Sequence, residues 1–498
     1  MRPLPKVFSL VKPRTIAVIV LFFASFMDLL DTTIVNVALP TIQKDLNASA
    51  AHLEWVVSGY VLAFAVLLIT GGRLGDIFGR KRVFLIGVAG FTLSSVACAA
   101  ASNGDTLVLG RVVQGLFAAL MTPQVLSVVQ VMFAPKERAA VFGGLGAISG
   151  LAAVAGPLLG GILVSGDLYG LGWRAIFLIN LPVGIALFIA GAIFIPESRS
   201  AARPRLDLLG VLLSSAGLFL AVFALIEGRE AGWPAWIWIM LAASPVVLAI
   251  FMWDQIRREA RIGFALVPAS LFNNRGYSAG VVTQFSFAAS IGGFFLILVL
   301  YLQIGLRFTA IDAALATLPF SIGALVGSAI AVPLAAKIGK GLIFAGAIAQ
   351  IGGLLWLARV VIDQGTGLTA TDMILPMALA GLGLTLEVVP LTDVALAKTP
   401  VANAGAASGV FGTFQQVGSA LGVAVVGVVF FGIVGTSFTQ PVLRDAFLGG
   451  LWVPITALAL SALASLLLPS VAAVRQHKID AELHDLLESA PETLPKVR

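Results

Sequence analysis

Residues 15–40 read TIAVIVLFFASFMDLLDTTIVNVALP, an apolar run long enough to cross a membrane, with the acid Asp31 in its interior. A bilayer core of roughly 30 Å requires about 20 apolar residues of helix. A charged side chain at that depth costs at least ~2.5 kcal/mol, so intramembrane acids usually face a cavity and serve transport. We therefore expect the rest of the chain to surround Asp31.

The composition excludes a soluble protein. Of the 498 residues, 59% are hydrophobic and only 11% are charged, and the mean hydropathy is +1.02. Apolar windows between charged or Gly/Pro-rich breaks predict an all-α polytopic membrane protein with fourteen transmembrane helices. The predicted spans are 15–39, 53–72, 82–101, 106–132, 139–164, 174–195, 207–226, 233–254, 276–304, 310–336, 341–360, 372–397, 403–434 and 446–469.

The charge distribution predicts an orientation. With the N-terminus inside, 24 of the 31 Lys and Arg residues face the cytoplasm, six lie outside and Arg111 lies within the membrane. This bias follows the positive-inside rule and predicts a multi-pass protein of the plasma (inner) membrane with both termini cytoplasmic. The net charge of +6 therefore reflects topology, and we expect no nucleic-acid partner.

A faint internal repeat predicts the domain layout. The turn at 72–81 and the turn at 333–340 share a Leu, a Gly and a basic residue, and each joins two predicted spans. If the turns correspond, the chain contains two six-helix halves, the architecture of secondary transporters that rock around a central site. The predicted units are an N-terminal bundle (1–200), two inserted helices (201–262), a C-terminal bundle (263–470) and a cytoplasmic tail (471–498).

The first of these turns, Gly-x-Leu-x-Asp-x-x-Gly-Arg-Lys, packs one acid and three bases into one tight turn with glycines. Its candidate gating residues are Gly72, Asp76, Gly79, Arg80 and Lys81. Asp76 could accept a hydrogen bond from the N-terminus of a neighbouring helix or form an ion pair with Arg80. Either contact would act as a latch that holds the cytoplasmic ends of two bundles together. Alternatively the bases only keep the loop inside, although that explains neither Asp76 nor the glycines.

Several stretches in the same order resemble the major facilitator superfamily, in particular its fourteen-helix drug:proton antiporter branch. They are the 72–81 loop, Leu30–Pro40, Arg111–Gly115, Gly150 with Gly156–Gly161, Trp173–Pro182 and Gly405–Gly409. The resemblance is dense over the first six spans and looser over the last six. It implies two six-helix bundles with two inserted helices, and export of drugs in exchange for protons.

Asp31 and Arg111 are predicted to lie at comparable depth in the membrane, because they fall about 12 Å and 8 Å from the outer ends of their helices. In such a pair, protonation of the acid changes the local charge, so a proton and a cation can compete for one site. A static structural ion pair is the alternative. The resemblance implies a part for Arg111 in the proton relay.

Glu387 is a second predicted intramembrane acid, without a basic neighbour within a helical turn. An isolated carboxyl in an apolar helix is a candidate proton carrier or an attractor of a cationic substrate. Alternatively it makes a polar contact with another helix.

The span at 139–164 is rich in glycine and carries a proline. Its candidate residues are Gly156, Pro157, Gly160 and Gly161, which resemble the family's antiporter motif. Small residues at four-residue spacing let helices approach closely, so we expect tight packing against the span at 233–254 or at 310–336.

Polar and aromatic side chains in the spans suit a pocket for large amphipathic compounds. The candidate substrate-binding residues are Asp31, Asn36, Gln114, Phe285, Phe294, Glu387, Phe414 and Gln415. Each Phe could instead face lipid or the core.

The sequence thus predicts a proton-coupled multidrug antiporter, acting as a monomer among membrane lipids on hydrophobic, cationic compounds. The alternatives are a dedicated exporter of one endogenous product, such as a lipid, antibiotic or siderophore, and a membrane sensor that does not transport. We expect no enzymatic activity and no cofactor. A phosphate-loop motif is absent from the sequence, and His52, His477 and His484 are too scattered for a metal site.

Overall fold

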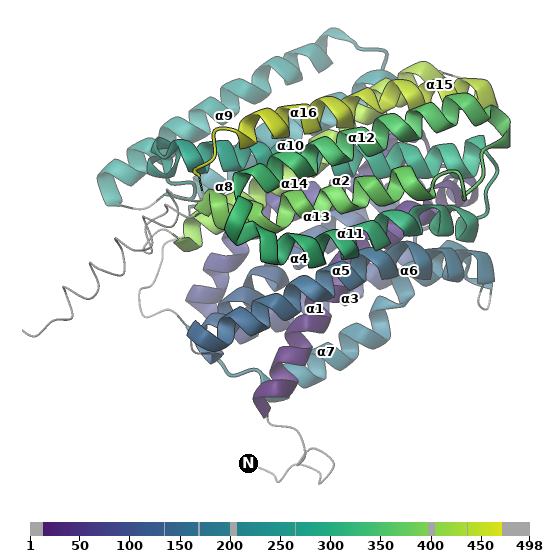
Figure 1. The fold of residues 1–498 in the computed structure, drawn as a ribbon. Coiled ribbons are helices and arrows are strands. Elements are labelled where there is room, and N and C mark those ends of the chain that lie inside the picture. The colour runs from purple at the N-terminus through teal and green to yellow at the C-terminus, as the bar shows by residue number, and fades with distance from the viewer. Residues whose placement is uncertain are drawn as a thin grey trace, which may run out of the picture.

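The computed structural model describes residues 13–133, 135–167, 170–199, 207–263, 265–396, 404–435 and 437–470, and Figure 1 shows its helices. The predicted cytoplasmic tail (471–498) lies outside the described residues. Within them no strand occurs. The helices are α1 (Pro13–Leu46), α2 (Ala50–Phe78), α3 (Arg80–Ala99), α4 (Gly104–Met132), α5 (Pro135–Gly166), α6 (Ala175–Leu178), α7 (Asn180–Phe194), α8 (Leu208–Glu230), α9 (Ala235–Ile262), α10 (Arg275–Leu300), α11 (Ala310–Ile338), α12 (Lys340–Gln364), α13 (Ile374–Leu396), α14 (Ala404–Val434), α15 (Gln440–Gly450) and α16 (Trp452–Ser465).

Each of the fourteen predicted spans coincides with helix. In the described part of the chain, thirteen segments are long and apolar enough to cross a membrane, and α5 contributes a shorter described apolar stretch, Ala155–Gly166. The largest boundary difference is in α9, which continues to Ile262 although the predicted span ends at residue 254. The charged residues that end the apolar window do not end the helix, because solvated side chains are compatible with helical backbone.

Two predicted spans are interrupted where proline follows. The predicted span 174–195 is divided between α6 and α7 at Ile179, and the span 446–469 between α15 and α16 at Leu451. Pro182 and Pro454 lie three residues after these interruptions. A proline ring clashes with the carbonyl four residues earlier and cannot donate a backbone hydrogen bond, so each proline disturbs the helix at this point.

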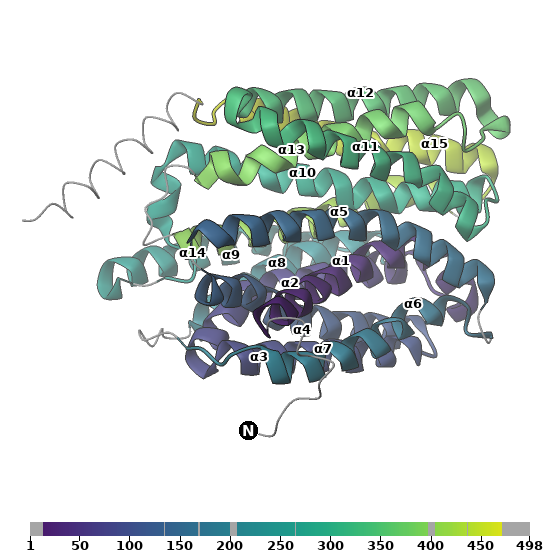
Figure 2. The ribbon, with the colours of Figure 1, turned by 60° about the horizontal axis from the view of Figure 1, so that its bottom comes forward.

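Helix pairing repeats along the chain. In the first group, α1–α7, α1 packs on α5 and α7, α2 packs on α4, and α3 packs on α4 and α7. In the second group, α10–α16, α10 packs on α14 and α16, α11 on α13, and α12 on α13 and α16. Figure 2 shows most of the first group in purple and blue below the green and yellow helices of the second. The equivalent pairing supports the predicted duplication.

The turns of the predicted repeat also correspond in detail. Gly79 and Gly339 both have positive φ, +111° and +54°, and each separates two consecutive helices. The ammonium of Lys81 donates to the backbone oxygen of Ala192 at 2.6 Å, and that of Lys340 to the backbone oxygen of Leu466 at 2.8 Å. Each lysine therefore ties the second-to-third helix turn to the final helical segment of its own group.

The two groups meet through α2 against α14 and through α5 against α11. At the predicted outer end, hydrogen bonds between described residues join them. The backbone N–H of Ile311 donates to the Ser165 hydroxyl at 3.2 Å, and the Gln303 amide donates to the Val37 backbone oxygen at 2.7 Å. The predicted outer ends of the groups are therefore in contact in this structure.

The inserted helices form a hairpin, α8 on α9, whose α8 packs on both α2 and α14. The Trp55 indole of α2 donates to the Glu227 carboxylate of α8 at 2.9 Å. At the other end of the hairpin, the buried Gln255 amide donates to Asp207 at 2.8 Å and accepts from the backbone N–H of Leu266 and Val267. Gln255 thus fixes the chain that leads from the hairpin into α10.

Candidate functional site

Asp31 of α1 and Arg111 of α4 form a buried ion pair inside the first helix group, each residue being 1% exposed. The Arg111 guanidinium also donates to the Gln114 side-chain oxygen at 2.7 Å and, through Nε, to the backbone oxygen of Val56 at 3.0 Å. The depths expected from the sequence are therefore compatible with direct contact. Burial strengthens the attraction between the charges and also makes an unpaired charge costly.

Three further polar side chains complete the surroundings of the Asp31 carboxylate. Gln114 Nε2 and Asn180 Nδ2 donate to Asp31 Oδ1 at 2.8 Å and 3.0 Å, and the same two nitrogens lie 2.8 Å and 3.2 Å from the hydroxyl of Ser95. These residues come from α3, α4 and α7. The carboxylate is thus held by one charged and two neutral donors from helices that surround α1.

Aromatic rings cover the guanidinium. The centre of the Tyr60 ring lies 4.2 Å from the Arg111 guanidinium carbon, and the centre of the Phe177 ring lies 5.8 Å from it. Such cation–π contacts stabilise a cation where water is excluded. The two rings therefore pack against the guanidinium of Arg111, which is shielded from bulk solvent.

Sequence reasoning missed Asp28, which is also buried in α1. Its carboxylate accepts from the Tyr60 hydroxyl and, at 3.1 Å, from the Thr122 hydroxyl. The spacing of three residues from Asp31 was the available signal, because residues i and i+3 share a helix face. Asn180, Ser95 and Tyr60 were missed too, and only the fold brings them to the acids.

This arrangement is suited to proton-dependent rearrangement. Adding a proton to Asp31 removes the negative charge that holds Arg111, while Gln114 and Asn180 can remain hydrogen-bonded to the carboxyl. The guanidinium must then find another partner, or the helices must move. A proton can in this way change the contacts between α1 and α4.

Glu387 of α13 lies in the second group and is fully buried. It was expected to be isolated, but the Gln350 amide of α12 donates to its carboxyl at 2.6 Å and the Ser461 hydroxyl of α16 also donates to it. The alternative interpretation, a polar interhelical contact, therefore describes its surroundings. Both partners are neutral, so this carboxyl can gain or lose a proton without breaking a described ion pair.

The predicted 72–81 turn is mostly helical, because α2 continues to Phe78 and α3 begins at Arg80. It contains the expected pair between Asp76 and Arg80, with Arg80 Nη2 and Asp76 Oδ1 2.9 Å apart. The loop is also bound to the chain after α7. Glu197 accepts from the Lys81 backbone N–H at 3.3 Å, and a side chain at Gly79 would collide with the Glu197 carboxylate. These contacts lie within the first group, so a latch between the two groups stays a prediction. Gly72, the first residue of the predicted motif, faces Pro123 of α4.

The small residues of α5 bring two other helices close. A Cβ atom at Gly156 would lie 1.9 Å from the Thr33 hydroxyl of α1, and one at Gly160 would lie 3.0 Å from Ile34. At Gly161 it would meet the start of α11, 2.9 Å from Ala314. The expected packing against 310–336 is therefore present, whereas the alternative partner 233–254 is wrong, because α9 pairs with α8. Pro157 lies within α5 between these contacts.

The predicted substrate-binding residues occupy separate places rather than one pocket. Gln114 belongs to the Asp31 site, and half-buried Asn36 donates to the backbone oxygen of Thr32 in its own helix at 3.3 Å. In the second group Phe294 is buried near Gln350, and Phe285 is half-buried against α14.

Phe414 and Gln415 lie apart from both carboxyl sites. The Phe414 ring meets Phe272 with centroids 6.3 Å apart, and Gln415 is exposed. The grouping expected from composition is therefore not observed in this conformation.

Comparison with known proteins identifies the family. The family model for the Major Facilitator Superfamily matches residues 21–423. The probable actinorhodin transporter of Streptomyces coelicolor is 43% identical over 430 residues, which cover 86% of this chain and 74% of that protein. The tetracenomycin C resistance and export protein of Streptomyces glaucescens is 36% identical over 418 residues, or 82% of this chain and 74% of that protein.

A solved structure has the same fold. A bacterial homologue of the human lysosomal transporter Spinster has a TM-score of 0.62 and 15% identity, over 94% of this chain and 98% of that one. Matches of this extent in sequence and fold identify a transporter rather than an enzyme. The chain belongs to the Major Facilitator Superfamily.

Proposed function

We propose that this protein exports hydrophobic, antibiotic-like compounds across the plasma membrane in exchange for protons. The observation that carries the proposal is the buried pair of Asp31 and Arg111, with Gln114 and Asn180 around the carboxylate. One relative is named as a probable actinorhodin transporter and another for tetracenomycin C resistance and export, which supports the substrate class. A buried carboxylate with one cationic partner supports proton coupling, since intramembrane acids commonly form proton relays.

In the proposed cycle, a proton from outside neutralises Asp31 and weakens its hold on Arg111. The contacts of α1 and α4 then change, drug is released, and the two helix groups rock so that the site faces the cytoplasm. Loss of the proton inside restores the ion pair and the affinity for drug. Glu387 is proposed as a second proton carrier in the other group.

The remaining predictions fit this cycle. The units 1–200 and 263–470 would be the rocking bundles, with 201–262 as an insert and both termini in the cytoplasm. The 72–81 loop would stabilise one closed arrangement at the cytoplasmic end, and Gly156, Gly160 and Gly161 would let α5 slide against α1 and α11. Repeated halves around a midplane site are the usual architecture of such transporters.

Two substrate ranges are compatible with the proposal. A multidrug exporter would accept unrelated hydrophobic cations, whereas a dedicated exporter would carry one endogenous product. The two relatives described above are each named for a single antibiotic, which favours the dedicated version. A sensor that binds ligand without transport is the third possibility.

The test is substrate-triggered proton movement in sealed proteoliposomes under an imposed pH gradient. Ethidium serves as a cationic probe and actinorhodin as an antibiotic probe. We expect proton release on addition of substrate, and we expect Asp31→Asn to abolish it, because an amide keeps the shape of the carboxyl but cannot accept the proton. Asp372→Asn is the matched control, since Asp372 is partly buried in a loop and bonded to Thr369.

The outcomes separate the possibilities. Release with both probes indicates a multidrug antiporter, and release with actinorhodin alone indicates a narrow exporter. Substrate flux without proton movement contradicts coupling. Binding without flux supports the sensor, and full export by a folded Asp31→Asn protein contradicts the role of Asp31.

A further inference from the structure

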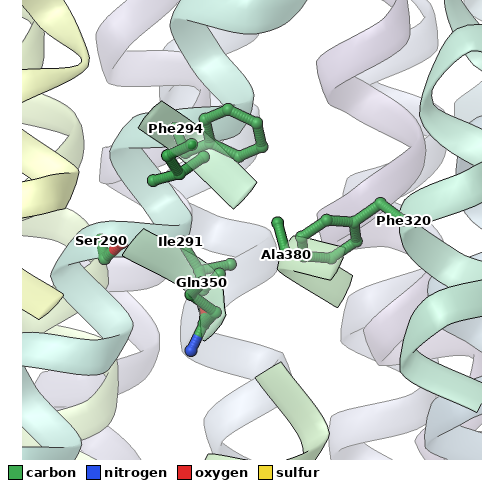
Figure 3. A pocket seen from close by; sticks show the side chains of 7 residues that line it. Ser290, Ile291, Phe294, Phe320, Gln350 and Ala380 are labelled. Carbon is green, nitrogen blue, oxygen red and sulfur yellow. The ribbon is translucent and has the colours of Figure 1, made fainter. Parts of the chain in front are cut away.

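A small cavity lies inside the second helix group, next to the side chain that holds Glu387. Its volume is about 10 Å³, which is close to the least space that a water molecule requires. It is lined by side chains of α10, α11, α12 and α13, shown in Figure 3. They are Ser290, Ile291, Phe294, Phe320, Gln350, Leu354 and Ala380.

Two of these side chains can bind water. The Ser290 hydroxyl is buried, and in the described part of the structure no protein group hydrogen-bonds to it. A buried hydroxyl without a partner is costly, so a polar ligand is expected to meet it. Gln350 is the other polar residue of the lining, and its amide nitrogen already donates to Glu387. A water molecule here would have partners on α10 and α12.

Two aromatic rings of the lining, those of Phe294 and Phe320, belong to a larger apolar cluster. The rings of Phe294 and Phe320 have centroids 6.3 Å apart, and Phe295 contacts both rings edge to face. Phe294 and Phe320 belong to an apolar cluster that also includes Ile34 and Ala38 of α1. Because this cluster crosses from one group to the other, separating the groups removes apolar packing from the cluster that contains both rings.

We propose that the cavity is a water site that connects Glu387 to solvent when the two helix groups separate. Ser290 and Gln350 hold the water, and Phe294 and Phe320 form its cover. Gln350 stands between the water and the carboxyl and takes up no proton itself. When the cover opens and the Gln350 amide releases its hydrogen bond to Glu387, the O–H bond of the Glu387 carboxyl breaks and its proton bonds to water, which passes it to solvent.

This inference rests on the proposed function only for its biological purpose, because the site can be tested without substrate. The measurement is the rate of hydrogen–deuterium exchange at the Glu387 carboxyl, followed by infrared spectroscopy of the resting protein in proteoliposomes. The carboxyl band is assigned as the one that disappears in Glu387→Gln. Failure of drug-triggered proton release would overturn the proposed function. The exchange rate at Glu387 would still test the water site, because it is measured without substrate.

Ser290→Ala removes one of the two water partners, and we expect exchange at Glu387 to slow roughly fivefold, the effect of losing one hydrogen bond. Ser286→Ala is the matched control. Ser286 lies one turn earlier in α10, its hydroxyl is likewise buried without a described hydrogen-bond partner, and it is outside the cavity lining. Equal rates in Ser290→Ala and Ser286→Ala would overturn the water site.

A second variant tests the aromatic cover, and it is expected to accelerate exchange at Glu387 where Ser290→Ala slows it. Phe320→Ala removes a ring from the lining, and we expect exchange to accelerate at least about threefold as water enters more often. Phe295→Ala, which removes a neighbouring ring outside the lining, should change the rate less. Unchanged exchange in Phe320→Ala, or a carboxyl that gives no protonated band in the wild type, would contradict the proposal.

Discussion

Asp28 and Asp31 lie three residues apart in α1, yet their carboxylates have different partners. Asp31 faces Arg111, whereas Asp28 accepts hydrogen bonds from the hydroxyls of Tyr60 and Thr122. Tyr60 links the two acids, because its hydroxyl binds Asp28 and its ring lies against the guanidinium of Arg111. A change at one carboxyl can therefore reach the other through a single side chain.

Tyr60→Phe should separate these two contacts. The variant keeps the ring over Arg111 but leaves the buried Asp28 with one donor fewer, so we expect the free energy of unfolding to fall by about 1.5–3 kcal/mol. The measurement is unfolding of the purified protein in detergent. The control is Tyr301→Phe, whose lost hydroxyl is buried without a described hydrogen-bond partner. Its free energy of unfolding should therefore stay the same or increase. Equal losses in both variants would argue against the Asp28 contact.

Asp76→Asn should affect transport more than stability. The pair with Arg80 is partly exposed, and such pairs contribute roughly 0–1 kcal/mol to stability. If the loop stabilises one closed arrangement, the rate of substrate-linked proton exchange should fall several-fold while the unfolding midpoint stays nearly constant. Asp363→Asn is the comparison, because it breaks an exposed pair of the same spacing with Arg359. A similar rate of substrate-linked proton exchange in both variants would contradict the proposed gating role of Asp76.

Gly156→Ala should force α1 and α5 apart. The new methyl group would lie 1.9 Å from the Thr33 hydroxyl, which no packed structure tolerates. Overpacking of this kind typically costs about 1–3 kcal/mol, so the unfolding temperature should fall and export should weaken. Gly166→Ala is the control at the end of the same helix, where no atom lies within 4 Å of the added carbon. A stable, fully active Gly156→Ala protein would mean that this close approach is not required.

Gln255→Ala should loosen the inserted hairpin. The buried amide satisfies the backbone N–H groups of Leu266 and Val267 and donates to Asp207, and the alanine would leave these groups without that partner. Each buried group left unsatisfied costs about 1–3 kcal/mol, so limited proteolysis near residues 263–267 should become faster. The exposed Gln415 provides the control, since Gln415→Ala should leave the cleavage rate unchanged. Unaltered cleavage in Gln255→Ala would show that the hairpin is held elsewhere.

Much of the fold follows from the sequence, because the bilayer imposes it. Spans must be apolar and helical over a fixed length, so the positions of the helices can be read from hydropathy. The prolines that interrupt two spans, Pro182 and Pro454, were visible too, but their effect on backbone continuity was not predicted. The candidate site was predictable only where a polar residue stood out in an apolar span, as at Asp31, Arg111, Gln114 and Glu387.

The sequence by itself determined which segments cross the membrane and which acids must be accommodated there, because an apolar span and a charge within it are visible before the neighbouring helices are known. Only the tertiary structure decided how that cost is met: Arg111 and Asn180 for Asp31, Tyr60 for Asp28, and Gln350 with Ser461 for Glu387. These partners lie tens to more than a hundred residues away, on apolar helices without a distinct amphipathic face. Their contacts arise from close packing of small residues, which hydropathy does not encode.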